Sequence, residues 1–235
     1  MDLEKLRQRF AALTCAHLTD ACVRAHVPVR CAPSSVQAAV AGTRLIGRAA
    51  PARHVGSVDV FLEAFTNAEP GGVLVVDNGG RTDESCVGDL VVLEAQAAGL
   101  SGVVIWGLHR DNADIRAIGL PVFSMGSIPT GPLLLQSRPA NALESAIVGE
   151  WTVTRDDLVL GDDDGVLFVP ADRADELFTL AETIRDTERR QAEQIRSGDT
   201  LRKQLHFDAF LTARRKNPAH TFREHLRSIG GAIEE

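Results

Sequence analysis

The chain has 235 residues, of which 44% are hydrophobic and 24% are charged, a composition typical of a globular protein with one sizeable core. Its formal net charge of −7 argues against non-specific nucleic-acid binding, which depends on lysine and arginine at the phosphates. Only three of its 25 basic residues are lysines, Lys5, Lys203 and Lys216. A Schiff-base enzyme and a P-loop both need a lysine in the core. The segment between Lys5 and Lys203 contains no lysine, so the sequence excludes both of these classes.

The cysteines and the apolar segments indicate the cellular setting. Four cysteines form no CxxC pair and no zinc-finger spacing with histidine. The N-terminal segment is charged rather than apolar, and no segment approaches the length of about 18 apolar residues that a membrane span needs. We therefore expect a cytoplasmic protein with reduced thiols that binds neither a membrane nor nucleic acid.

In chain order, the hydrophobic spacing first predicts two helices. Residues 2–13 carry apolar groups at helical intervals, and Thr19 and Asp20 are predicted to cap a second, short helix. A strand at residues 44–50 follows, and a further helix is predicted to begin at Ser57.

The middle of the chain alternates predicted strands and helices. Residues 73–76 and 103–105 are continuous apolar runs typical of buried strands, and residues 88–98 between them have the pattern of a helix. A short helix that ends at Ile118 and a strand at 121–123 follow.

The C-terminal third begins with two further strands, predicted at residues 158–160 and 166–169. A long amphipathic helix is expected over 171–197. We therefore expect one α/β domain over residues 1–198, and a C-terminal extension, residues 199–235, that packs on a neighbouring subunit.

The strand–helix–strand segment of residues 73–111 predicts where a ligand binds. Such a βαβ unit has parallel strands, so the loops that follow the two strands emerge at the same edge of the sheet. Ligands of open α/β sheets bind at this edge, where helix N-termini also attract anions. The loop at residues 79–80, the start of the 88–98 helix and the loop at 107–111 are therefore expected to converge.

Asp89, Arg110 and Asp111 stand at this predicted edge. Two carboxylates suit Mg²⁺ or Mn²⁺, bound directly or through water, and an arginine stabilises negative charge that develops on a substrate oxygen. The alternative interpretation is structural: the helix dipole favours Asp89 in a first turn, and Arg110 and Asp111 form a surface pair or a cap.

The segments GGVLVVDNGG and VGDLVVLEAQAAGLSGVVIWGLHRDNADIRAIGLPVFSMG resemble the RraA-like family. This family includes the regulator of ribonuclease E activity and the 4-hydroxy-4-methyl-2-oxoglutarate/4-carboxy-4-hydroxy-2-oxoadipate aldolases. The aldolases carry an aspartate, twenty residues and an Arg-Asp pair, and Asp89 precedes Arg110 and Asp111 by that spacing. The resemblance covers most of the chain, from residues 18–20 to 161–170, and implies a swivelling β/β/α sandwich assembled as homotrimers or homohexamers.

The resemblance also implies roles for the matching residues. Asp111 corresponds to the direct metal ligand, and Asp89 to a ligand that acts through a metal-bound water. Arg110 corresponds to the residue that contacts the 2-oxo group and the enolate. The backbone N–H groups that match the cradle of the substrate carboxylate belong to Gly88, Asp89, Leu90 and Val91.

A further ligand of this kind is implied from a neighbouring subunit. In the family, a glutamate of the C-terminal helix approaches the metal-bound waters of the next subunit. Glu188 is the best match for this glutamate, and Glu193 is the second.

The loop before Arg110 departs from the family pattern. Trp106 replaces a common acidic residue, and His109 replaces a residue that is usually apolar. His109 is a candidate to hydrogen-bond a distal carboxylate of the substrate, with a half-exposed histidine as the alternative. Trp106 is interpreted as a packing residue rather than a recognition residue, and Cys86 as a packed or exposed thiol.

Together with the Asp–Arg–Asp motif, the resemblance implies a divalent-metal-dependent aldolase that uses Mg²⁺ or Mn²⁺ to cleave a 4-hydroxy-2-oxo diacid to pyruvate and a 2-oxo acid. Decarboxylation of oxaloacetate passes through the same enolate and is expected as a second activity. No side chain stands out as the base, so a metal-ordered water is expected in that role. The alternative function is a non-catalytic binding protein of the ribonuclease E regulator type.

Overall fold

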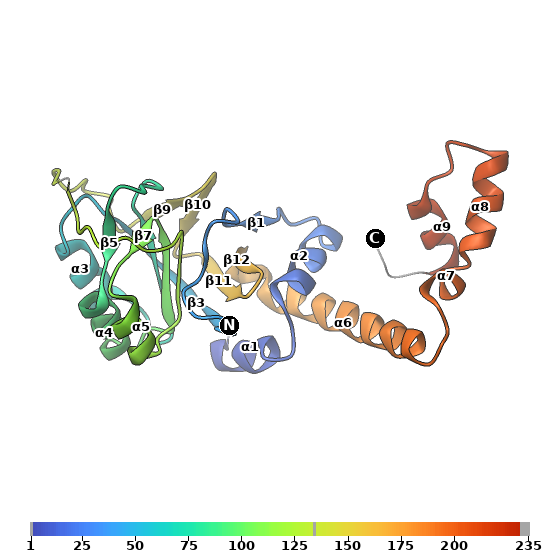
Figure 1. Cartoon of the computed structure of the whole chain (residues 1–235), viewed down its shortest axis with the longest axis horizontal. Coiled ribbons are helices and arrows are strands. Elements are labelled where there is room, and N and C mark those ends of the chain that lie inside the picture. Colours follow the sequence, from blue (N-terminus) through green and yellow to red (C-terminus); the bar gives the residue numbers. More distant parts are fainter. Residues whose placement is uncertain (1, 134, 231–235) are drawn as a thin grey trace. The chain divides into compact units, whose positions relative to one another are not determined.

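The computed structural model describes residues 2–133 and 135–230 and separates the chain into two compact units. The first unit consists of residues 1–16 and 29–175, and the second of residues 17–28 and 176–235. The first unit contains the sheet and the predicted site, and the second is helical (Figure 1). The predicted boundary after residue 198 does not coincide with this division.

The first unit is built on a mixed sheet that has eight strands within the described residues. In spatial order they are β1 (Arg30–Cys31), β12 (Gly165–Pro170), β11 (Asp157–Asp162), β3 (Leu45–Arg53), β4 (Val73–Asp77), β6 (Gly102–Trp106), β8 (Val122–Ser124) and β2 (Gln37–Ala38). Neighbours from β3 to β8 run parallel, and the flanking pairs run antiparallel. Six of these strands, β3, β4, β6, β8, β11 and β12, overlap the six strands predicted from the sequence.

Strand β4 shows why the central strands are unbroken apolar runs in the sequence. Val73 and Val75 point into one buried cluster, whereas Leu74 and Val76 point into another on the opposite face of the sheet. Successive side chains of a strand alternate between faces, so a strand covered on both faces has no solvent-exposed position for a polar residue.

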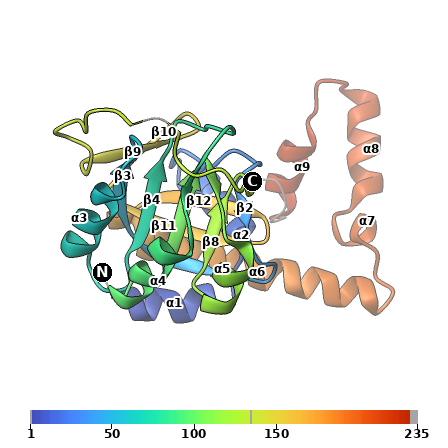
Figure 2. The ribbon, with the colours of Figure 1, turned by 60° about the vertical axis from the view of Figure 1, so that its left-hand side comes forward.

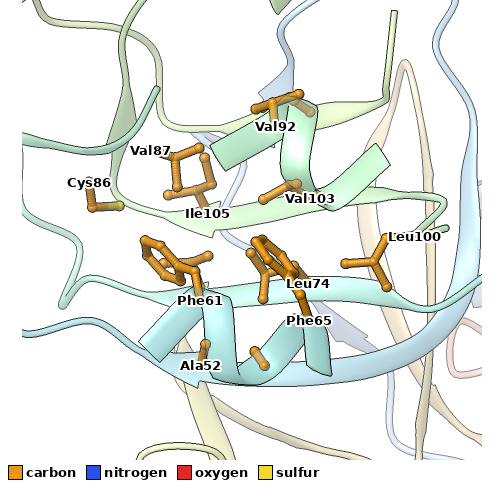
Figure 3. Close-up of a cluster of buried hydrophobic side chains, with 14 of the residues drawn as sticks. Ala52, Phe61, Phe65, Leu74, Cys86, Val87, Val92, Leu100, Val103 and Ile105 are labelled. Carbon is orange, nitrogen blue, oxygen red and sulfur yellow. The ribbon is translucent and has the colours of Figure 1, made fainter. Parts of the chain in front are cut away.

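Three helices cover one face of the parallel strands (Figure 2). They are α3 (Asp59–Asn67), α4 (Asp89–Ala97) and α5 (Asn112–Ile118). Phe61 and Phe65 of α3 and Val92 of α4 pack onto Leu74, Val103 and other buried side chains of the sheet (Figure 3). Burying one such side chain contributes roughly 1.5–3 kcal/mol, so this apolar layer fixes where the first turns of α3 and α4 lie.

A hairpin covers the opposite face. Strands β9 (Ser145–Val148) and β10 (Trp151–Thr154) pair antiparallel, and Ala146, Val148 and Val153 pack with Phe123 and Phe168 of the sheet. Helices, central sheet and hairpin strands together form the predicted β/β/α sandwich. The hairpin itself was not predicted, because each of its strands has only four residues.

The N-terminal helices correct one prediction. Helix α1 (Leu3–Phe10) lies within the predicted residues 2–13, but α2 (Cys15–Arg24) begins four residues before Thr19. Thr19 and Asp20 therefore lie inside α2 and do not cap it. The buried residues Cys15, Leu18 and Cys22 have helical spacing across this start, and their burial extends the helix toward the N-terminus.

The second unit contains the long predicted helix and a short helical extension. After the turn η1 (Ala171–Arg173), the long helix is α6 (Ala174–Arg196), and it is followed by α7 (Leu201–Gln204), α8 (Phe207–Lys216) and α9 (Phe222–Ile229). Phe210 lies in ring contact with Phe207, Phe222 and His225, which holds α8 against α9. The last five residues of the predicted extension lie outside the described part of the chain.

Helices long and apolar enough to cross a membrane are absent from the described part of the chain.

Candidate active site

The site forms where two parallel strands of the sheet end. Strands β4 and β6 are in register up to the pair Asp77 and Trp106. Beyond them, β5 (Ser85–Val87) and β7 (Leu108–His109) form a small parallel sheet of their own. The N–H group of Arg110 then donates to the carbonyl oxygen of Val87 at 3.0 Å. This pairing places the start of α4 beside the loop of Arg110 and Asp111, so the predicted convergence of these loops is found in the structure.

Asp111 lies at the centre of the three predicted side chains. Its Oδ2 atom is 3.3 Å from Nε of Arg110 and 3.4 Å from the backbone nitrogen of Asp89. The residue has left-handed backbone angles (φ 62°, ψ 43°), which aspartate adopts more readily than most non-glycine residues. This conformation turns the carboxylate of Asp111 back toward the start of α4 instead of along α5.

Two glycines make room for these side chains. A Cβ atom at Gly88 would lie 2.5 Å from Oδ2 of Asp111, and one at Gly131 would lie 2.8 Å from Nη1 of Arg110. Real Cβ atoms do not approach other atoms so closely, because the repulsion is steep. The backbone at residues 88 and 131 therefore lies directly against the Arg110–Asp111 pair and holds it between two loops.

The first turn of α4 offers groups that bind an anion. Within the described residues, the N–H groups of Leu90 and Val91 have no hydrogen-bond acceptor. The carboxylate of Asp89 likewise has no hydrogen-bond or ion-pair partner in the described part of the chain. The free N–H groups and the helix dipole favour a negatively charged ligand group here, beside oxygen atoms that suit a cation.

A cleft of about 480 Å³ opens onto these groups. Its lining includes His54, Ser85, Cys86, Asp89, Arg110 and Leu135. Two of the lining residues, Leu90 and Leu135, expose 74% and 76% of their surface. The cleft is therefore charged where Arg110 lines it and apolar where these two leucines line it.

His54 is a lining residue that the sequence did not single out. It follows the last residue of β3, and its Nδ1 atom lies 2.8 Å from Oδ1 of Asn78. The ring is stacked on Phe61, with the ring centroids 5.2 Å apart. Burial lowers the pKa of the imidazole, and this effect exceeds the opposing effect of the Asn78 hydrogen bond. The strand predicted at residues 44–50 extends to Arg53. Because ligands of α/β sheets bind where parallel strands end, the correct strand end would have identified His54 as a candidate site residue.

Cys86 lies in the same cleft as a packed thiol. Burial raises its pKa well above the ordinary value for cysteine, and its Sγ atom lies 3.7 Å from the carbonyl oxygen of Leu108. The thiol therefore stays protonated and is a poor nucleophile.

The structure does not bring His109 into the cleft. The residue is 3% exposed, with Nδ1 2.7 Å from Oγ of Ser124 and Nε2 2.6 Å from Oδ1 of Asn112. Both ring nitrogens are occupied inside the protein, so the suggested contact with a distal substrate carboxylate has no group to make it. The half-exposed alternative is also wrong, because His109 is a buried crosslink between β7, β8 and α5.

Two other candidate residues are not among those that line the cleft. Trp106 packs beside the core cluster of β4 and the hairpin, and a Cβ atom at Gly80 would lie 2.7 Å from its ring. Glu188 belongs to α6 of the second unit, where its Oε2 atom lies 3.2 Å from Nε2 of His17. The predicted approach of Glu188 to the site of a neighbouring subunit remains a prediction.

The sequence matches the family described as Aldolase/RraA over residues 15–168, which is more than half of the chain. The chain belongs to the RraA-like family. Protein DlpA of Legionella pneumophila is 34% identical over 131 residues, which are 55% of this chain and 21% of that protein. A putative 4-hydroxy-4-methyl-2-oxoglutarate aldolase of Halalkalibacterium halodurans is 30% identical over 135 residues, which are 56% of this chain and 63% of that protein. The match therefore spans less than two thirds of either relative.

A solved structure supports the RraA-like fold independently. The Streptomyces coelicolor protein RraAS2, described as an unusual member of the RNase ES inhibitor RraA protein family, superposes with a TM-score of 0.68 at 25% identity. The match covers 79% of this chain and 94% of that one. The relatives of this chain thus include one named as a putative aldolase and one from a ribonuclease inhibitor family, so the function has to be argued from the site.

The donor set of this RraA-like site fits a hard divalent cation better than zinc. Within the described residues, no three or more histidine, cysteine, aspartate and glutamate side chains gather in a way that could hold a metal ion. Zinc takes three or four such ligands, whereas Mg²⁺ keeps several waters and binds through one or two carboxylates. Asp111 and Asp89 supply such carboxylates, and 33% of the Asp111 side chain is exposed.

Proposed function

We propose that this RraA-like protein is a divalent-metal-dependent aldolase that cleaves a 4-hydroxy-2-oxo diacid to pyruvate and a 2-oxo acid. The observation that carries the proposal is the position of one carboxylate, Asp111, within 3.4 Å of both Arg110 Nε and the backbone nitrogen of Asp89. Arg110 and the residues with free helix N–H groups line the cleft, and the Asp111 carboxylate adjoins Arg110. Such a set of groups is suited to bind and polarise a 2-oxo acid.

Each group has a distinct task in this proposal. Asp111 would hold Mg²⁺ or Mn²⁺ directly, and Asp89 would hold it through water. When bound, the cation acts as a Lewis acid at the 2-oxo group. The N–H groups at the start of α4, including those of Leu90 and Val91, bind the substrate's 1-carboxylate. The backbone nitrogens of Gly88 and Asp89 complete this cradle.

Arg110 stabilises the charge that develops during cleavage. Breaking the C3–C4 bond leaves the enolate of pyruvate, with negative charge on the oxygen of the former 2-oxo group. The guanidinium of Arg110 donates hydrogen bonds to that oxygen, and the loops at Gly88 and Gly131 hold it in place beforehand. A donor that is already oriented stabilises the transition state without a reorganisation cost. Oxaloacetate decarboxylation yields the same enolate and is proposed as a second activity.

The proposal includes assembly into a homotrimer or homohexamer. Glu188 is the residue that a neighbouring copy is proposed to contribute through water. Mass photometry of the purified protein tests the assembly, and a monomer at working concentration would remove Glu188 from the proposed site.

Release of pyruvate tests the proposed activity. Purified protein with Mg²⁺ or Mn²⁺ is expected to release pyruvate from a 4-hydroxy-2-oxo diacid and from oxaloacetate, and a chelator is expected to abolish both reactions. Arg110→Ala and Asp111→Ala are each expected to lower kcat by about 100-fold or more, because each removes charge that contacts the reacting oxygens.

The matched control is Asp114→Asn, which changes an exposed carboxylate on α5. This variant is expected to keep wild-type activity. Absence of turnover by the wild type with either metal across such acids would contradict the proposal. Capture of a ribonuclease, together with no metal binding in calorimetry, would then support the regulator function instead.

A further inference from the structure

The proposed chemistry leaves one buried, titratable side chain of the cleft without a task. Loss of the C4 hydroxyl proton is required for the cleavage, and the tasks given above to Asp89, Arg110 and Asp111 do not include it. His54 lines the same cleft as Asp89 and Arg110, and it is only 6% exposed.

Three contacts fix the position of the His54 ring. Its backbone N–H donates to the carbonyl oxygen of Asp77 at 2.9 Å, its face stacks on Phe61, and its Nδ1 atom is 2.8 Å from Asn78 Oδ1. Asn78 is itself 4% exposed, and a Cβ atom at Gly107 would lie 3.0 Å from the Cβ atom of Asn78. An amide packed so closely holds the ring in one orientation.

The Asn78 contact also determines which nitrogen carries the proton. An amide oxygen only accepts hydrogen bonds, so the Nδ1 atom of His54 donates and the neutral ring has its free lone pair on Nε2. Within the described residues, Nε2 has no hydrogen-bond partner. The ring therefore has an unoccupied proton acceptor, and His54 lines the cleft that is proposed to bind a hydroxy acid.

Three other polar residues of the cleft, Ser85, Cys86 and Asp89, do not compete for this task. Cys86 stays protonated because burial raises its pKa. The hydroxyl of Ser85 donates to the carbonyl oxygen of Thr130 at 2.7 Å. Asp89 is assigned to the cation.

We propose that His54 is the general base of the cleavage, accepting the C4 hydroxyl proton at Nε2, with Asn78 as its positioning residue. The inference rests on the proposed aldolase function and replaces the metal-ordered water that was expected as the base. The O–H bond breaks as an N–H bond forms, and the O–H electrons form the new carbonyl group. The C3–C4 electrons pass to the pyruvate enolate, whose C3 takes a proton from water, and the imidazolium releases its proton to water.

The charges around His54 predict how the reaction depends on pH. Glu84 and Asp59 favour the protonated ring, Arg81 opposes it, and burial opposes it most, so the pKa of His54 lies below the ordinary value of about 6.5. Asp89 and Arg110 also face the cleft, with opposite charges. The base is therefore neutral and active at neutral pH, and kcat for cleavage falls as pH drops through this lowered pKa.

The experiment compares two reactions of one enzyme. Decarboxylation of oxaloacetate has no hydroxyl proton to remove, whereas aldol cleavage requires a base. His54→Gln is therefore expected to lower kcat for cleavage by about 100-fold or more and kcat for decarboxylation by less than about 10-fold. His206→Asn, which changes an exposed histidine of the second unit, is the control and is expected to change neither.

A second variant tests the base assignment without removing the His54 ring. Asn78→Asp places a carboxylate next to Nδ1, which is expected to raise the pKa of His54 and move the acid limb of the cleavage profile to higher pH. NMR titration of the His54 ring measures this pKa directly in wild type and variant.

The possible results separate the two proposals. A wild type active on both substrates, with His54→Gln losing both reactions equally or neither, would overturn the base assignment and leave the aldolase proposal intact. An acid limb that does not move in Asn78→Asp, although the NMR pKa does, would also overturn it. A wild type without any turnover removes both proposals.

Discussion

Two histidines at the strand ends of the first unit, His54 and His109, have opposite surroundings. Both are almost fully buried, and each lies at or next to the end of a β-strand. His109 adjoins Arg110 in the sequence, yet both of its ring nitrogens are bonded to Ser124 and Asn112 within the protein. His54 lies more than 50 residues from Arg110 in the sequence and lines the cleft with it. The topology of the sheet therefore determines which histidine lines the cleft, and proximity in the sequence does not.

The largest expected effect concerns Gly88, which lines the cleft together with His54. Gly88→Ala is expected to lower kcat for pyruvate release by about 100-fold, because the new Cβ atom would lie 2.5 Å from Asp111 Oδ2 and displace the carboxylate. The backbone of Gly88 (φ −122°, ψ −174°) suits any residue, so the melting temperature is expected to change little. Steady-state kinetics and thermal unfolding measure the two effects. If the folded Gly88→Ala variant kept the wild-type kcat, the position of the Asp111 carboxylate would not matter for pyruvate release.

His109 is expected to affect stability instead of substrate choice. His109→Leu leaves Ser124 and Asn112 without their ring partners and is expected to lower the free energy of unfolding by about 2 kcal/mol. Chemical denaturation measures this loss. The ratio of KM values for substrates with and without a distal carboxylate is expected to stay the same, because the ring does not reach the cleft. A selective rise of KM for the diacid would restore His109 as a recognition residue.

The smallest effect is the pH dependence of stability caused by His54. Its pKa is lowered in the folded protein, so the unfolded chain binds more protons between that value and about 6.5. The stability contributed by the neutral ring is therefore present above pH 6.5 and is lost as pH falls through this window. Urea titrations at pH 8 and pH 5 are expected to show a larger loss for wild type than for His54→Gln. An equal loss in both proteins would place the titrating group elsewhere.

Much of the site's framework was predictable from the sequence. The apolar runs of β4 and β6, the helix pattern of α4 and the rule that parallel strands end at one edge predicted the meeting of Asp89 with Arg110 and Asp111. These features depend on local hydrophobic patterns, which burial on both faces of the sheet makes unambiguous.

The parts that were missed depend on long-range packing. The pairing of β5 with β7 involves strands of three and two residues, which are too short to leave a pattern. The position of His54 depends on how far β3 extends, and its last residues pair in register with β4 up to Arg53 and Asp77. The burial of His109 depends on Ser124 and Asn112, which lie on different elements. A sequence pattern does not encode such contacts between distant residues.

A crystal structure with Mn²⁺ and oxalate, a stable mimic of the pyruvate enolate, tests the central claim most directly. The account predicts the cation on the Asp111 carboxylate, an oxalate oxygen hydrogen-bonded to Arg110, and the other oxalate carboxylate at the N–H groups of Leu90 and Val91. It also predicts that Nε2 of His54 faces the position that C4 of a substrate would occupy. A cation held by other residues, or oxalate bound outside this cleft, would contradict the account.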